Sequence, residues 1–291
     1  MRTSPVSILS FGVLGIILSA CSVSTSPNSI TFKTQTKYLG ENQTKEATAA
    51  WNGEEITVDN KNGDVLVQGD STTTKIFVTA KPFAFADGKD AAKGTTGEPD
   101  AQAALKEVIA SIAIDESAGK ISIHCGQSNG SHGSAAQGTT GCDAFTVHVP
   151  QGSATKGLTL SSVAQNGSNT ATNLYAADGA QIKIGSGNGS VTATGITGGA
   201  NLKSDNGDLI ASVTPTKGSV VEVTTGNGDI TLSLPTDFAA DKVSLTAGGK
   251  VTVEGFTDLT AASTSRGTQG TGAASITATA SSLGDLTVKA Q

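Results

Sequence analysis

One stretch decides the fold class: Val221-Glu222-Val223-Thr224-Thr225-Gly226-Asn227-Gly228-Asp229-Ile230-Thr231-Leu232-Ser233-Leu234. Apolar and polar side chains alternate on both sides of a glycine turn, and this alternation predicts two short strands. The Asn227-Gly228 pair is a turn signal because both residue types tolerate positive φ. The stretch therefore predicts a unit of strand, turn and strand.

Copies of this unit recur along the chain. The turns that we identify, each flanked by alternating apolar residues, are Asn62-Gly63, Asn188-Gly189, Asn206-Gly207, Asn227-Gly228, Gly248-Gly249 and Gly284. From Ile184 to Leu245 equivalent positions recur every 18 to 22 residues. A strand-turn-strand repeat of this length predicts a β-solenoid, because one copy is too small to bury a core and must stack on its neighbours. We expect a mainly β domain, a single-stack β-solenoid or β-helix-like structure.

The first half of the chain departs from the repeat. Asp100–Ile109 predicts one short helix, with Asp100 as its cap and an apolar face that includes Leu105 and Val108. Lys81–Gly97 has the composition of a loop, whereas Phe145–Pro150 alternates as a strand does. The expected fold is therefore β with a single helix in its N-terminal half.

These copies, and the order of strand pair, short helix, strand pair and glycine-turn repeats, resemble a bacterial family called the putative adhesin domain of β-strand repeats. The family has no known function, and its members are often exported. The resemblance covers roughly residues 50–291. It implies one β-solenoid-like domain and no catalytic residues to carry over. The Cys125–Cys142 loop and an insertion at Thr257–Gly272 depart from the family pattern.

The N-terminus has the form of an export signal, with Arg2 followed by an apolar run from Val6 to Leu18. Leu18-Ser19-Ala20-Cys21 resembles the lipobox of bacterial lipoproteins. This resemblance implies cleavage before Cys21, acylation (including palmitate) of Cys21, and, with Ser22 next, the outer membrane. An ordinary cleaved signal peptide or an uncleaved anchor is the alternative.

We therefore expect three segments: a signal peptide at 1–20, the lipidated Cys21 with a flexible tether to residue 49, and the repeat domain at 50–291. The tether is polar and lacks sustained periodicity, although Ile30–Phe32 and Tyr38-Leu39 could form a first strand instead. The protein is expected to be exported and anchored to the cell envelope, with the domain on a periplasmic or surface face.

The remaining cysteines flank a glycine- and serine-rich loop. In an exported protein, Cys125 and Cys142 indicate a disulfide. His124, His132 and His148 lie near this loop, so a metal site is the alternative, although no metal-ligand spacing is present. The disulfide is the stronger interpretation, and we predict no metal.

Aspartates follow several turns, at Asp64, Asp208, Asp229 and Asp285. Glycine-aspartate repeats can bind Ca²⁺ between copies, but the spacing here is too wide for the known nonapeptide pattern. An aspartate can also bond backbone N–H groups near a turn. Turn chemistry is therefore preferred to calcium binding.

The composition excludes some functions. The net charge is −6, and there is no basic cluster that could bind the phosphates of a nucleic acid. No nucleotide fingerprint or nucleophile motif is present, so we expect no cofactor and no enzyme. Outward positions on the repeats are mostly threonine, serine, lysine or alanine. This threonine- and serine-rich, weakly charged face favours a non-catalytic, adhesion-like module that binds glycan or protein. A carbohydrate-active enzyme on the same scaffold and an accessory protein of envelope signalling are the alternatives.

Overall fold

The computed structural model describes residues 19–26, 29–87, 97–130, 132–133, 135, 140–263, 273–281 and 283–291. Side chains are described from residue 35 onward within these ranges. The described residues are mainly β and form two sheets and one helix. The expected signal sequence lies outside the described residues, apart from Ser19 and Ala20.

The strands are divided between a twelve-stranded and a nine-stranded sheet. The larger sheet contains β1 (Ser19–Ser26), β2 (Ser29–Leu39), β3 (Gln43–Glu46), β5 (Asp64–Asp70), β6 (Phe77–Asp87), β9 (Thr140–Pro150), β11 (Asn169–Tyr175), β13 (Val191–Thr197), β15 (Leu209–Thr214), β17 (Ile230–Leu234), β19 (Val251–Glu254) and β21 (Leu286–Ala290). The smaller sheet contains β4 (Glu55–Asn62), β7 (Ala113–Ser117), β8 (Lys120–Cys125), β10 (Leu160–Asn166), β12 (Gln181–Asn188), β14 (Gly199–Asn206), β16 (Val220–Asn227), β18 (Ala240–Ala247) and β20 (Ala274–Ala280).

The two arms of one copy lie in different sheets. In the stretch Val221–Leu234, β16 belongs to the smaller sheet and β17 to the larger one. Each arm pairs in parallel with the same arm of the neighbouring copy, so that Val221 is opposite Ala200 and Ile230 is opposite Leu209. The inward side chains of both arms are buried in one common core. The turn is therefore a corner between two sheets.

One copy escaped the sequence pattern. Strands β10 and β11 pair in parallel with the neighbouring strands, as the strands of other copies do. Two of their inward positions are the polar residues Ser162 and Asn169. Both are fully buried, and the Asn169 amide donates hydrogen bonds to the carbonyls of Ser162 (3.0 Å) and Gly185 (2.9 Å). These polar groups form hydrogen bonds with each other and with the backbone, so they can be buried. They stand where other copies have apolar residues, so the alternation of apolar and polar residues did not indicate this copy.

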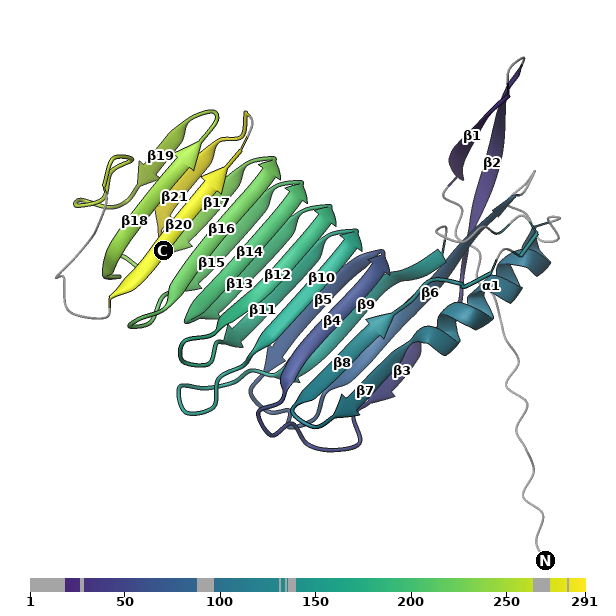
Figure 1. Ribbon diagram of the computed structural model, residues 1–291, viewed down its shortest axis with the longest axis horizontal. Helices are drawn as coiled ribbons and strands as arrows, with labels where there is room; N and C mark the ends of the chain where they lie inside the picture. The colour runs from purple at the N-terminus through teal and green to yellow at the C-terminus, as the bar shows by residue number, and fades with distance from the viewer. Residues whose placement is uncertain are drawn as a thin grey trace, which may run out of the picture.

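The last two copies exchange places. The C-terminal pair β20 and β21 does not add to the end of the stack but lies between β16/β17 and β18/β19. In Figure 1 the yellow C-terminal strands lie among the green ones, and β18 and β19 form that end of the molecule. Chain order and spatial order therefore differ from β17 onward. Residues 264–272 of the insertion expected at 257–272 lie outside the described ranges.

At the opposite end of the stack, strands occur before residue 50. The segment expected to be a tether carries β2 and β3, which both pair antiparallel with β6, and Tyr38 and Leu39 are buried. β6 itself runs to Asp87, through part of the expected loop. The alternative of a first strand at Ile30–Phe32 and Tyr38-Leu39 falls within β2. Local periodicity did not indicate β3 or the extension of β6 to Asp87, where Pro82 sits at a register shift.

The expected helix is confirmed as α1 (Glu98–Ser111), which lies at this end of the stack (Figure 1). It packs Ala101, Ala104 and Leu105 against Ala84 and Ala86 of β6. Asp100 is not its cap, because the helix begins earlier, after Gly97, with Pro99 in its first turn. Among the described residues, no helix is long and apolar enough to cross a membrane.

Candidate functional site

Turn glycines line one edge of the stack, which we call the glycine corner. They are the predicted Gly63, Gly189, Gly207, Gly228 and Gly284, together with Gly167, which the sequence pattern did not indicate. Successive backbones are so close here that a Cβ on Gly207 would lie 2.5 Å from the carbonyl oxygen of Gly189. Gly207 also has a φ of +148°, which side chains rarely adopt. Gly248 and Gly249 occupy the corresponding corner between β18 and β19, where Gly249 N–H donates to the Gly284 carbonyl.

The asparagines of these turns form a ladder. Each side-chain amide donates to the side-chain oxygen of the preceding copy, in the order Asn227 to Asn206 (2.9 Å), Asn206 to Asn188 (3.2 Å), Asn188 to Asn166 (2.9 Å) and Asn166 to Asn62 (2.9 Å). The asparagines thus tie neighbouring copies together as well as turning the chain.

The aspartates that invited a calcium interpretation also connect copies. Asp208 accepts a hydrogen bond from the backbone N–H of Asp229 (3.0 Å), and Asp229 accepts one from Asp285 (2.8 Å). Asp285 accepts from Lys250 N–H (2.7 Å), and Asp64 accepts from Ser168 N–H (2.8 Å). The bonds run to the next copy, whereas the sequence suggested bonds within the same turn.

The predicted disulfide between Cys125 and Cys142 is confirmed. Cys125 ends β8 and Cys142 lies in β9, and these strands flank β4 and β5 as the arms of a further copy would. No short turn joins them, since 14 residues separate the two strands in the chain. The disulfide therefore closes the corner that a glycine turn closes in other copies.

The three histidines have three separate partners. His148 stacks on Phe77 with ring centroids 4.1 Å apart, His124 lies 3.6 Å from Asp115, and His132 Nε2 lies 2.9 Å from Glu107 Oε1. Glu107 also accepts hydrogen bonds from the Ser128 hydroxyl and the Asn129 N–H, and these bonds, that of Ser128 first, lower the pKa of its carboxyl group. Glu107 thus anchors the cysteine loop to α1. Cys21 lies in β1, but its side chain is outside the described residues, so lipidation stays a prediction.

A threonine row crosses the outer face of the larger sheet. Residues at one register position of consecutive strands are Thr79, Thr146, Leu66, Thr170, Thr192, Ile210, Thr231, Thr287 and Thr252. Their chain neighbours point into the core, as Val191 and Ala193 do beside Thr192. Ile210, at 51% exposure, lies near the middle of the row. Threonine is therefore the commonest residue at this outward register position, and Leu66 and Ile210 interrupt the row.

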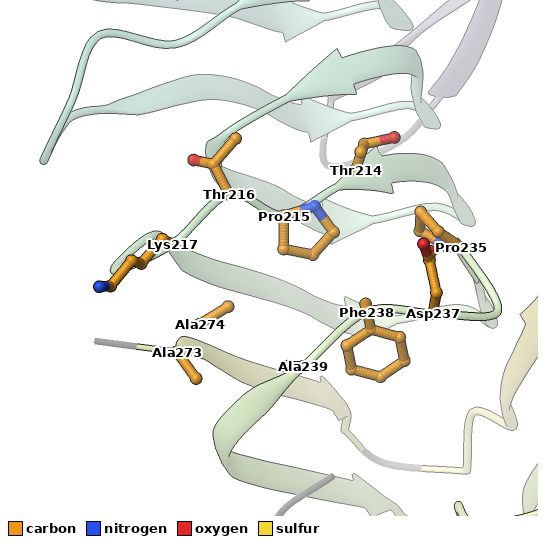
Figure 2. Close-up of a pocket in the computed structure, with 10 residues that line it drawn as sticks. All are labelled: Thr214, Pro215, Thr216, Lys217, Pro235, Asp237, Phe238, Ala239, Ala273 and Ala274. Carbon is orange, nitrogen blue, oxygen red and sulfur yellow. The ribbon is translucent and has the colours of Figure 1, made fainter. Parts of the chain in front are cut away.

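A cavity of about 500 Å³ opens beside the loops that return the chain from the larger to the smaller sheet. Thr214–Lys217 after β15 forms one wall, Pro235–Ala239 after β17 forms another, and Ala273-Ala274 at the start of β20 completes it. In Figure 2 Lys217 and Asp237 lie on opposite sides of Pro215, and the Lys217 side chain extends away from the rings of Pro215 and Phe238. The lining thus combines apolar residues with two residues of opposite charge, Lys217 on one wall and Asp237 on the other.

The cavity exists because of the exchanged copies. The connection after β15 leads to the neighbouring strand position, whereas the connection after β17 passes over β20 to reach β18 at the end of the stack. A crevice forms where neighbouring connections diverge, as it does in open α/β sheets. Sequence reasoning missed this site, and its sequence signals are Pro215 and Pro235, each of which directly follows a strand.

Two solved structures are similar to the chain. One is a putative cell adhesion protein from Clostridium sporogenes, 11% identical, with a TM-score of 0.46 over 86% of this chain and 100% of that one. The other is a putative adhesin from Bacteroides fragilis, 12% identical, with a TM-score of 0.38 over 86% of this chain and 97% of that one. No protein-family model and no curated protein match the sequence. Neither likeness bears on what this chain binds, and the family resemblance stays a prediction.

Proposed function

We propose that this chain is a non-catalytic, adhesion-like binding module of the cell envelope. Its scaffold is a β-solenoid, and Cys21 anchors it to a membrane through lipid. The contact surface is the threonine row on the larger sheet, and the partner is a glycan or a protein.

The threonine row is the observation that carries this proposal. Adjacent strands lie about 4.7–4.9 Å apart, so hydroxyl and methyl groups repeat at that spacing across the face. Each threonine offers one donor, two acceptors and a methyl group, which suits many small contacts with a long ligand. The exposed Ile210 adds an apolar contact at the centre of the row. Binding would then depend on several neighbouring copies at once.

The solenoid is supported by the pairing of arms. Copies pair in parallel from β4/β5 through β16/β17, with one register shift between β13 and β15 after Ala193, and their arms share one core. Such an array presents each outward position as a straight row, so the scaffold itself produces the periodic face.

A substitution on the row tests the contact surface. We expect the double variant Thr192→Glu/Thr231→Glu to lose at least tenfold in binding to purified cell-wall polysaccharide or to the proteins of an envelope extract. The matched control is Thr224→Glu/Thr277→Glu, at outward positions of β16 and β20 on the other sheet. Equal binding by the two double variants, or binding that persists in both, would exclude the threonine row as the contact.

Lipid anchoring is tested separately. In cells that express the full chain, metabolic labelling with an alkyne fatty acid should label the wild type and fail to label Cys21→Ser. A Cys21→Ser protein that still carries the label, or a wild type without it, would rule out lipidation at this residue.

A further inference from the structure

We infer that the cavity beside Pro215 and Phe238 is a binding site for a short peptide with free, oppositely charged ends. The site is separate from the threonine row and does not depend on the proposed adhesive contact. Its occupant would place a carboxylate at Lys217, an ammonium group at Asp237 and an apolar side chain between them.

The walls of the cavity are held by backbone hydrogen bonds. The Ala274 N–H donates to the carbonyl of Ala239 (3.3 Å), and the Ser275 N–H donates to that of Ser219 (2.9 Å). The beginning of β20 is therefore bonded to both return loops, and each loop is fixed relative to the other. A pre-formed hollow of about 500 Å³ is within the size range of small-ligand sites, roughly 300–1,000 Å³.

Part of the cavity lining is apolar and can contact an apolar group. Phe238 is 6% exposed, and its ring packs edge-to-face on Phe256 with centroids 5.8 Å apart, which fixes its orientation. Pro215 is rigid, and Ala273 and Ala274 add small apolar surfaces. A ligand side chain between these groups would remove apolar surface from water on both partners.

The charges select the class of ligand. Lys217 and Asp237 are exposed, and neither takes part in an ion pair with another described residue. A simple anion would meet Asp237, and a simple cation would meet Lys217. A ligand with a carboxylate and an ammonium group at opposite ends satisfies both residues, and the apolar lining residues favour a peptide with an apolar side chain over a small polar zwitterion.

The test uses the tripeptide Ala-Phe-Ala in three forms: with free ends, with an acetylated N-terminus and with an amidated C-terminus. Isothermal titration calorimetry with the wild-type chain should show binding of the free form. Each capped form should bind about two- to fivefold more weakly, as expected for the loss of one exposed ion pair.

Two variants then assign the charges. In Asp237→Asn, acetylation should no longer weaken binding, and in Lys217→Gln, amidation should no longer weaken it. Both side chains are exposed, so neither change should affect folding. Asp178→Asn, in the return loop after β11, and Lys183→Gln, on β12, are exposed controls and should retain the wild-type discrimination.

Three results would overturn the inference. They are no heat with the free tripeptide at its highest soluble concentration, equal binding of free and capped forms, and discrimination that survives in Asp237→Asn and Lys217→Gln. If the free form binds and each variant removes the discrimination at its own end, the site and the polarity of its ligand are established.

Discussion

Replacing Gly207 with alanine tests how the copies are stacked. The new Cβ would lie 2.5 Å from the carbonyl oxygen of Gly189 and 2.9 Å from the backbone nitrogen of Ser190. Both neighbours are backbone atoms of the preceding copy, so no side chain can rotate away. The residue would also have to keep a φ of +148° or change it. The copy to which Gly207 belongs must therefore move relative to its neighbour.

The size of the effect can be worked from these contacts. Forcing an extra methyl group into a packed site costs about 1–3 kcal/mol. A side chain in a backbone region reserved for glycine costs about 1–3 kcal/mol more. A shift of the backbone also strains the bond from the Thr225 hydroxyl to the Gly207 carbonyl (2.9 Å). We expect Gly207→Ala to lower the free energy of unfolding by about 3–5 kcal/mol, or the melting temperature by on the order of 10 °C.

Thermal unfolding followed by far-UV circular dichroism measures this loss, with two glycine controls. Gly185→Ala places its Cβ no closer than 3.9 Å to any neighbour and has no positive φ, so it should change stability by less than about 0.5 kcal/mol. Gly179→Ala has a φ of +72° and no atom within 4 Å, so it isolates the conformational cost of about 1–2 kcal/mol. If Gly207→Ala is no less stable than Gly179→Ala, the close approach of copies at the glycine corner is refuted.

Three further predictions concern other contacts. Removing the disulfide with Cys125→Ala/Cys142→Ala should lower the free energy of unfolding by about 3 kcal/mol, because the disulfide constrains the unfolded chain over a sequence separation of 17 residues. An unchanged midpoint of thermal unfolding would contradict this. Asn188→Ala breaks two ladder bonds and should lower the free energy of unfolding, measured by chemical denaturation, by about 1–3 kcal/mol. Asn227→Ala breaks one ladder bond and should lower it by about 0.5–1.5 kcal/mol. Equal losses in the two variants would argue against the ladder. The pKa of the Glu107 carboxyl group is lowered on folding, so its contribution to stability is complete above the unfolded pKa of about 4.5 and is lost as the pH falls through the folded pKa. The variant Glu107→Gln should lack this acid-dependent part of the stability. A Glu107 carboxyl group that titrates by NMR at or above pH 4.5 would contradict the assignment.

Local patterns in the sequence predicted strands on either side of the glycine turns, the helix and the disulfide. These features depend on neighbouring residues: alternation around Asn227-Gly228, one apolar helix face, and two cysteines on either side of one loop. The outward threonine face was also predictable, because in a strand the residues beside each inward position point outward. In each case, the residues that decide the structure are close together in the sequence.

Features that depend on distant partners were missed. β3 carries no sustained alternation, and β2 was indicated only as an alternative to a tether, yet both pair with β6. The copy at β10 and β11 buries Ser162 and Asn169, which satisfy backbone groups across two copies. From composition alone, serine and asparagine are assigned to loops or to the surface. A polar side chain can be buried when it has a hydrogen-bond partner, and composition does not identify that partner.

The exchanged order of the last two copies also depends on pairing between distant segments, and its consequence is the cavity. Leu286 pairs with Ile230 on one side and Val251 on the other, and all three positions are aliphatic, so the alternation fits either order of stacking. The long connection after β19 allows the chain to return, and the final pair takes the inner place. The return separates the connections on either side of β20, and the cavity of Pro215 and Phe238 opens between them. A chain whose copies stacked in sequence order would carry the threonine row but would have no reason to form this cavity.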